Sequence, residues 1–109
     1  MYAYSCPDDF LFYLITTSPT EAKKKFKQSI KDEWGNACCY CGSTDKLSLD
    51  HVVPKIRGGK DLKNNLVCSC VSCNRDKGHS VMEEWYQNQQ FFSEIRLNRI
   101  NRWVYDEIK

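Results

Sequence analysis

Two Cys-x-x-Cys pairs constrain the fold of this chain more than any other feature of its sequence. Cys38 and Cys41 form the first pair, Cys70 and Cys73 form the second, and 28 residues (42–69) separate them. Zinc prefers four ligands in a tetrahedron, and a Cys-x-x-Cys turn presents two thiolates to one ion. We therefore expect these four cysteines to bind one structural zinc, which would hold together the two ends of the segment between them.

The other cysteines leave some ambiguity about the ligands. Cys39 and Cys68 neighbour the two pairs and are alternative ligands, but Cys70 is preferred because it lies at the two-residue spacing from Cys73. Cys6 is expected to be a free thiol. A thioredoxin-like redox role would need a βαβ context around one pair, which the sequence lacks. The odd count of seven cysteines, four of them in two metal-type pairs, indicates a reduced, intracellular protein rather than a disulfide framework.

Length and charge allow one domain with a modest core. The chain has 109 residues and a net charge of only +2, but residues 51–79 contain six basic residues and two acids. A polyanionic partner would need positive charge in that segment. The apolar run 10–15 has no basic flank before it and is too short to span a bilayer. We therefore predict a cytoplasmic protein with no membrane partner.

The chain is predicted to form a single domain, 1–109, in three parts. Residues 1–36 supply a hydrophobic brace and a basic helix, which Ser18 would cap and whose apolar stripe runs from Ala22 to Trp34. Residues 37–79 form the metal-binding motif. Residues 80–109 supply C-terminal helices: one capped by Ser80 with Glu83, with Trp85, Tyr86 and Phe92 packed inward, and one from Ser93 with Leu97, Ile100, Val104 and Ile108 on one face.

The central part is expected to follow the order strand, loop, strand and helix. Alternation at Leu47-Ser48-Leu49 predicts a short strand that delivers Asp50 and His51. Pro54 and Gly58-Gly59 predict a loop. The expected bounds are about 47–49 for the first strand, 54–65 for the loop, 66–68 for the returning strand and 71–78 for a helix that Gly78 ends.

Three residues inside this segment suggest catalysis. Asp50 offers hard oxygen ligands suited to magnesium or manganese. His51 has a side chain whose ordinary pKa lies near neutrality, so it can take a proton from water. The amide oxygen of Asn74 could complete a two-ligand metal site that leaves positions open for water and phosphate. At a strand end, Asp50 and His51 are expected to reach a common cleft.

The combination of these motifs resembles the HNH endonuclease signature. The matching stretches cover about residues 38–79: Leu49-Asp50-His51-Val52-Val53-Pro54, Gly58-Gly59, Asn64-Asn65-Leu66 and Cys70-x-x-Cys73-Asn74-x-x-Lys77-Gly78. This resemblance implies an α+β fold: a small ββα-metal core (HNH, His-Me finger) with zinc knuckles, flanked by N- and C-terminal helices.

The resemblance also implies roles for single residues. His51 would be the general base, and Asn65 would brace the loop and help to orient it. Asp50 and Asn74 would bind the catalytic Mg²⁺ or Mn²⁺. His79 is a possible further contact to metal or phosphate. Candidate contacts to double-stranded DNA are basic residues in the loop, at the end of the motif helix and in the last helix: Lys55, Arg57, Lys77, Arg96 and Arg99.

The resulting prediction is a metal-dependent DNA endonuclease that nicks one strand per active site. Relatives of this size include homing, phage-packaging and restriction nucleases, and nothing in the sequence chooses among them. Monomer and homodimer are both compatible with it. The alternative is a non-catalytic zinc-finger module that binds nucleic acid, which accounts for the cysteines and lysines but not for the spacing of Asp50, His51, Asn65 and Asn74.

Overall fold

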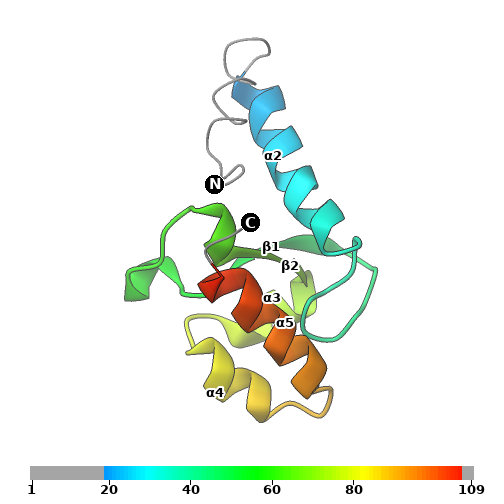
Figure 1. The fold of residues 1–109 in the computed structure, drawn as a ribbon, viewed down its shortest axis with the longest axis vertical. Helices are drawn as coiled ribbons and strands as arrows, with labels where there is room; N and C mark the ends of the chain where they lie inside the picture. The colour runs from blue at the N-terminus through cyan, green and yellow to red at the C-terminus, as the bar shows by residue number, and fades with distance from the viewer. Residues whose placement is uncertain (1–18, 107–109) are drawn as a thin grey trace.

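The computed structural model describes residues 19–106, arranged as a short hairpin with helices on both sides (Figure 1). The apolar run 10–15, Cys6, the predicted Ser18 cap and Ile108 lie outside these residues. The elements in chain order are α2 (Pro19–Glu33), β1 (Leu47–His51), the 3₁₀ turns η1 (Lys55–Arg57) and η2 (Lys63–Asn65), β2 (Leu66–Cys70), α3 (Val71–Lys77), α4 (Met82–Gln87) and α5 (Glu94–Tyr105).

The hairpin is antiparallel, and α3 follows its second strand without a loop. Leu47 pairs with Cys70 and His51 with Leu66. Every residue of β2 is buried, whereas β1 is mostly half-buried. Helix α3 packs on both strands and ends at Gly78, whose φ is +53°. The predicted order of strand, loop, strand and helix is therefore confirmed, and so is the α+β fold class.

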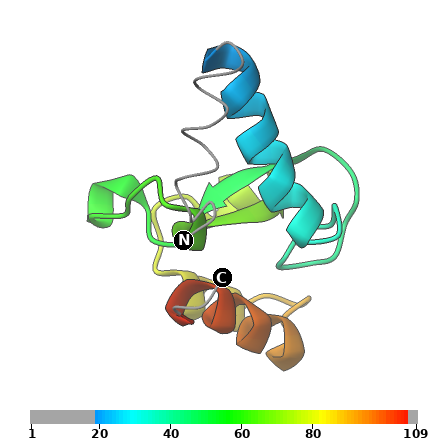
Figure 2. The same ribbon diagram turned by 45° about the horizontal axis from the view of Figure 1, so that its top comes forward.

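Helix α2 lies on one side of the hairpin and α4 and α5 lie on the other (Figures 1 and 2). The predicted stripe of α2 is inward-facing, since Ala22, Ile30 and Trp34 are buried. Helix α5 begins as predicted after Ser93, whose hydroxyl accepts a hydrogen bond from the backbone N–H of Arg96. The helical flanks expected from the sequence are thus present in the described part of the chain.

An aromatic cluster joins α4 to the first cysteine pair. The ring of Tyr40 packs edge-on against Trp85 and Tyr86, at centroid distances of 5.0 and 5.5 Å. The hydroxyl of Tyr86 donates a 2.6 Å hydrogen bond to the carbonyl of Tyr40. The inward packing predicted for Trp85 and Tyr86 is confirmed. Their common partner is Tyr40, which lies inside the first Cys-x-x-Cys pair.

The predicted capping box at Ser80 is wrong. Helix α4 begins at Met82, and Val81 occupies the cap position without a side-chain hydrogen bond. The backbone N–H of Ser80 instead bonds to the carbonyl of Lys77, 3.0 Å away. Ser80 therefore belongs to the turn that follows α3. It does not cap the next helix, which the sequence spacing had suggested.

Arg99 connects α5 to the end of α2. Its Nη2 donates a 2.8 Å hydrogen bond to the carbonyl of Glu33, and its guanidinium carbon lies 4.3 Å from the centroid of the Trp34 ring. Trp34 also packs against Trp103, at a centroid distance of 5.3 Å. A cation near the C-terminus of a helix is favourable. The structure therefore gives Arg99 a packing role between two helices; its side chain is also exposed, so the predicted DNA contact stays a prediction.

We expect Arg99→Ala to lower the free energy of unfolding by about 1–2 kcal/mol, because it removes one hydrogen bond to a helix-end carbonyl and one cation–π contact at the surface. Chemical denaturation at a fixed zinc concentration measures the loss. Arg75→Ala, at an exposed position of α3, is the control and should change stability by less than about 0.5 kcal/mol. Equal effects of the two substitutions would contradict this role.

Candidate active site and metal centre

Four thiols form one compact cluster beside the hairpin. The Sγ atoms of Cys38, Cys41, Cys70 and Cys73 all lie within 4.8 Å of one another, and those of Cys41 and Cys70 are 3.8 Å apart. A tetrahedron with metal–sulfur bonds of about 2.3 Å has edges of about 3.8 Å. The donor set and its spacing therefore fit a zinc ion. Cys68 is buried outside the cluster.

The protonation of this cluster is uneven. Burial acts to raise the pKa of Cys38, but backbone N–H groups of Cys41, Cys70 and Tyr40 outweigh burial and hold that pKa below its ordinary value. Burial raises the pKa of Cys41. Burial also raises the pKa of Cys73 well above the usual range, and the negative charge of Cys38 adds to the effect. A metal ion must therefore displace protons from at least two thiols.

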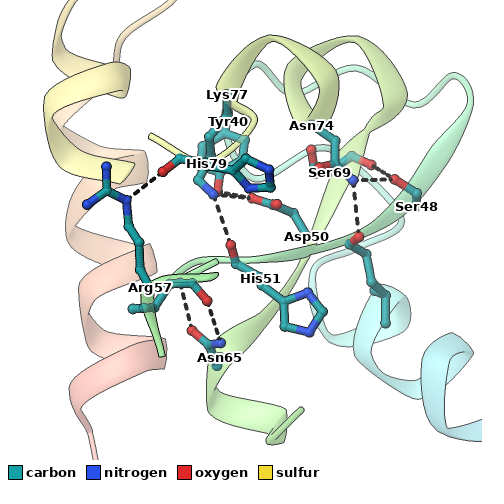
Figure 3. A network of polar contacts seen from close by, with 12 residues as sticks. Tyr40, Ser48, Asp50, His51, Arg57, Asn65, Ser69, Asn74, Lys77 and His79 are labelled. Carbon is teal, nitrogen blue, oxygen red and sulfur yellow. Dashed lines mark hydrogen bonds and ion pairs between the residues drawn. The ribbon is translucent and has the colours of Figure 1, made fainter. Parts of the chain in front are cut away.

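The carboxylate of Asp50 is buried beneath α3 (Figure 3). Its Oδ2 accepts a 2.7 Å hydrogen bond from the hydroxyl of Tyr40 and lies 3.2 Å from the Nζ of Lys77. The same Nζ donates to the carbonyl of His51 at 2.9 Å. The prediction that Lys77 contacts phosphate is wrong, because its side chain is fully buried and its ammonium group neutralises Asp50.

Asn74 reaches from α3 to the first strand. Its Nδ2 donates to the carbonyl of Leu49 at 3.2 Å and to the hydroxyl of Ser48 at 3.3 Å. Within residues 19–106, neither the Oδ1 of Asn74 nor the Oδ1 of Asp50 accepts a hydrogen bond from a protein group, so both oxygens are available. Two hard oxygen donors of this kind fit magnesium or manganese.

His51 leaves β1 in the opposite direction (Figure 3). Asp50 and Asn74 lie on the α3 side of the strand, whereas the ring of His51 points to the other side. Strand β1 runs through His51, and neighbouring side chains of a strand point to opposite faces. Asp50 and His51 therefore point to opposite sides of the end of β1, and their common cleft stays a prediction.

The side chain of Asn65 holds the loop that follows His51. Its Oδ1 accepts a 2.9 Å hydrogen bond from the N–H of Val53, and its Nδ2 donates to the carbonyls of Val53 and Lys60 at 3.1 and 2.9 Å. Asn65 is itself buried at the end of η2. These bonds bring the two ends of the 53–60 loop together, which is the bracing geometry expected for this position.

The predicted DNA contacts divide into two groups. Lys55 and Arg57 are exposed in the loop after His51, and the Nε of Arg57 donates a 2.6 Å hydrogen bond to the carbonyl of His79, which is also exposed. Arg96 instead lies over the first cysteine pair, where a Cβ atom added to Gly42 would be 2.4 Å from its Nη2. Lys55, Arg57 and His79 therefore lie on the loop side of the candidate site, and Arg96 lies beside Gly42.

Two residues that the sequence did not single out contact the predicted site. Tyr40 supports Asp50 from within the first cysteine pair. Asp61 lies against His51, with its Oδ1 2.6 Å from Nε2. Asp61 is one of only two acids in the basic segment 51–79, which was an available signal. No sequence signal marked Tyr40, because its partner is reached only through the fold.

Comparison with known proteins identifies the family. A family model described as HNH endonuclease matches residues 38–90, which include both cysteine pairs and the whole hairpin. Residues 38–90 of this chain therefore match the HNH endonuclease family. Two curated relatives are similar to it: the CRISPR-associated endonuclease Cas9 of Corynebacterium diphtheriae, 33% identical over 76 residues, and the SPbeta prophage-derived putative HNH endonuclease YoqL of Bacillus subtilis, 32% identical over 96 residues.

The similarity covers most of this HNH chain but only part of each relative. The matches span 63% and 71% of the chain, and 7% and 39% of the two relatives. The fold is similar to that of the type II-C Cas9 enzyme from Actinomyces naeslundii, with a TM-score of 0.53 and 26% identity over 72% of this chain and 10% of that one. Within residues 19–106, no helix is long and apolar enough to cross a membrane.

We expect Lys77→Met to lower the free energy of unfolding of this HNH domain by about 3–5 kcal/mol, because it leaves the buried Asp50 carboxylate without its counter-charge. Urea unfolding at a fixed zinc concentration measures the change. Lys24→Met, on the exposed face of α2, is the matched control and should change stability by less than about 0.5 kcal/mol. A Lys77 variant as stable as the control would show that the buried pair is dispensable.

Proposed function

We propose that this HNH domain is a metal-dependent endonuclease that hydrolyses phosphodiester bonds of double-stranded DNA, with one active site nicking one strand. The observation that carries the proposal is the division of side chains around the end of β1: His51 on one side, and Asp50 and Asn74 on the other. In a displacement at phosphorus, the attacking and leaving oxygens lie roughly in line on opposite sides. A phosphate across this strand end would meet the base from one side and the metal ligands from the other.

Each residue then has one task. His51 takes a proton from the attacking water, since an unprotonated imidazole is a competent base near neutral pH. Asp50 and Asn74 would hold Mg²⁺ or Mn²⁺, which when bound supplies positive charge that stabilises the departing 3′ oxygen. Asn65 keeps the loop after His51 closed. Lys55 and Arg57 provide positive charge for the neighbouring phosphates.

The four-thiol cluster is proposed to bind a structural zinc. Its cysteines come from the segment before β1 and from the junction of β2 with α3. One ion would therefore tie the first pair to the start of the helix that carries Asn74. Because Tyr40 lies inside the first pair and bonds to Asp50, zinc binding would also support the position of the catalytic carboxylate.

A plasmid assay tests the catalytic proposal. With Mg²⁺ or Mn²⁺, the wild-type protein is expected to convert supercoiled plasmid to the open circle, and His51→Ala should slow this by about 100-fold or more because it removes the general base. Circular dichroism and zinc content should match the wild type. A wild-type protein that binds DNA but leaves it supercoiled with both metals would instead be a non-catalytic zinc module.

Zinc binding to the metal-free protein should release protons and strengthen as pH rises. The raised pKa values of Cys41 and Cys73 keep these thiols protonated near neutral pH, so zinc competes with their protons until the pH reaches their folded-state pKa values. Titration calorimetry in two buffers of different ionisation enthalpy measures the release. Cys39→Ser, outside the cluster, should keep one zinc per chain and Cys70→Ser should not; a buffer-independent heat would contradict the prediction.

A further inference from the structure

Asp61 is an acid whose carboxylate is shared between His51 and a lysine. Its Oδ1 lies 2.6 Å from the Nε2 of His51, and its Oδ2 lies 3.0 Å from the Nζ of Lys55. Each oxygen thus has one partner, which determines the orientation of the carboxylate plane. The side chain of Asp61 is 63% exposed, whereas that of His51 is 29% exposed. Since exposed ion pairs contribute little to folding stability, this contact needs another explanation.

The backbone before Asp61 is built to place it. Asn65 donates to the carbonyl of Lys60, the residue directly before Asp61, and holds Val53 with the same amide. Gly59 approaches the opposite end of the loop so closely that a Cβ atom there would lie 1.7 Å from the carbonyl oxygen of Val53. The loop is therefore closed by contacts that leave little freedom at its ends. Asn65 acts on the surroundings of His51 through the position of Asp61.

The contact determines which nitrogen of His51 can act as the base. Hydrogen bonds from His51 and then from Lys55 lower the pKa of Asp61, so its carboxylate is ionised at neutral pH. An ionised carboxylate can only accept hydrogen bonds. In the neutral ring, Nε2 must then carry the proton, and Nδ1 has the free lone pair.

We propose that Asp61 is a positioning residue for His51: it holds the Nε2–H so that Nδ1 receives the proton of the attacking water, and it stabilises the imidazolium that results. This inference rests on the proposed endonuclease function. In the step, an O–H bond of water breaks and an N–H bond forms at Nδ1, while the new P–O bond forms and the bond to the 3′ oxygen breaks. Asp61 stays ionised throughout, as the partner acid of a histidine base does.

Cleavage kinetics provide the first test. Asp61→Ala should lower kcat on the order of 10- to 100-fold, as the loss of a group that orients a functional histidine does, with KM for DNA unchanged or lower. Asp61→Glu should recover part of the lost activity, because it restores an ionised acceptor. Glu33→Ala is the matched control: it also removes one exposed acid paired with a lysine, Lys63, and should keep the wild-type kcat. A wild-type kcat in Asp61→Ala would overturn the proposal.

Nitrogen NMR of the histidine rings provides a second test that does not need cleavage. The chain contains only two histidines, so His79→Gln assigns the signals of His51. At a pH where the ring is neutral, the wild type should show the proton on Nε2, with a directly bonded N–H signal slow enough in exchange to be resolved. Asp61→Ala should lose that signal. A proton on Nδ1 in the wild type would overturn the proposal.

The two tests separate this inference from the proposed function. A wild-type protein that nicks DNA while Asp61→Ala nicks equally well would remove the role of Asp61 and leave the endonuclease intact. A wild-type protein that cuts no DNA would remove the endonuclease and the catalytic role of Asp61 with it, and the NMR signal would then show whether the pair is only a surface contact.

Discussion

The rest of the structure depends on how the buried carboxylate of Asp50 is neutralised. Burying a charge is costly unless a partner of opposite charge and hydrogen bonds accompany it. Lys77 supplies the charge from the end of α3, and Tyr40 supplies a hydroxyl from within the first cysteine pair. One carboxylate on β1 therefore connects the cysteine cluster, the hairpin and the helix that carries Asn74. Because Lys77 also donates to the carbonyl of His51, the same ammonium group contacts the side chain of Asp50 and the backbone of His51.

This arrangement gives the two proposed metal sites a physical connection. Tyr40 packs on the aromatic rings of α4, and its carbonyl and hydroxyl are both hydrogen-bonded, to Tyr86 and Asp50. These contacts hold Tyr40 from the core side. The segment 53–61 is held separately, by Asn65 and by the close approach of Gly59 to Val53. The group of Tyr40 and Asp50 and the segment 53–61 are therefore held by separate contacts, and the two meet at His51.

Much of the fold could be predicted because its signals are local. Alternation, Gly58-Gly59 and Gly78 determine where the strands, loop and α3 begin and end, and these bounds agree with the structure within about two residues. Local signals do not show partners that are distant in the sequence. Arg99 contacts a carbonyl 66 residues earlier, and Lys77 a carbonyl 26 residues earlier, so neither role is visible in local spacing. For Lys77 the sequence predicts a DNA contact because a basic side chain is normally exposed, whereas the fold buries it against Asp50.

The sequence by itself determined which chemical groups are present: four thiols at zinc spacing, hard oxygen donors in Asp50 and Asn74, and one histidine, His51, between them in the chain. Residue type and spacing suffice for that, because ligand preference is a property of the side chain. Only the tertiary structure decided the directions of these side chains. The pleat of β1 sends Asp50 and His51 to opposite sides, and the closed loop brings Asp61 to the ring of His51. Those directions depend on pairing and packing between segments that the chain order does not specify.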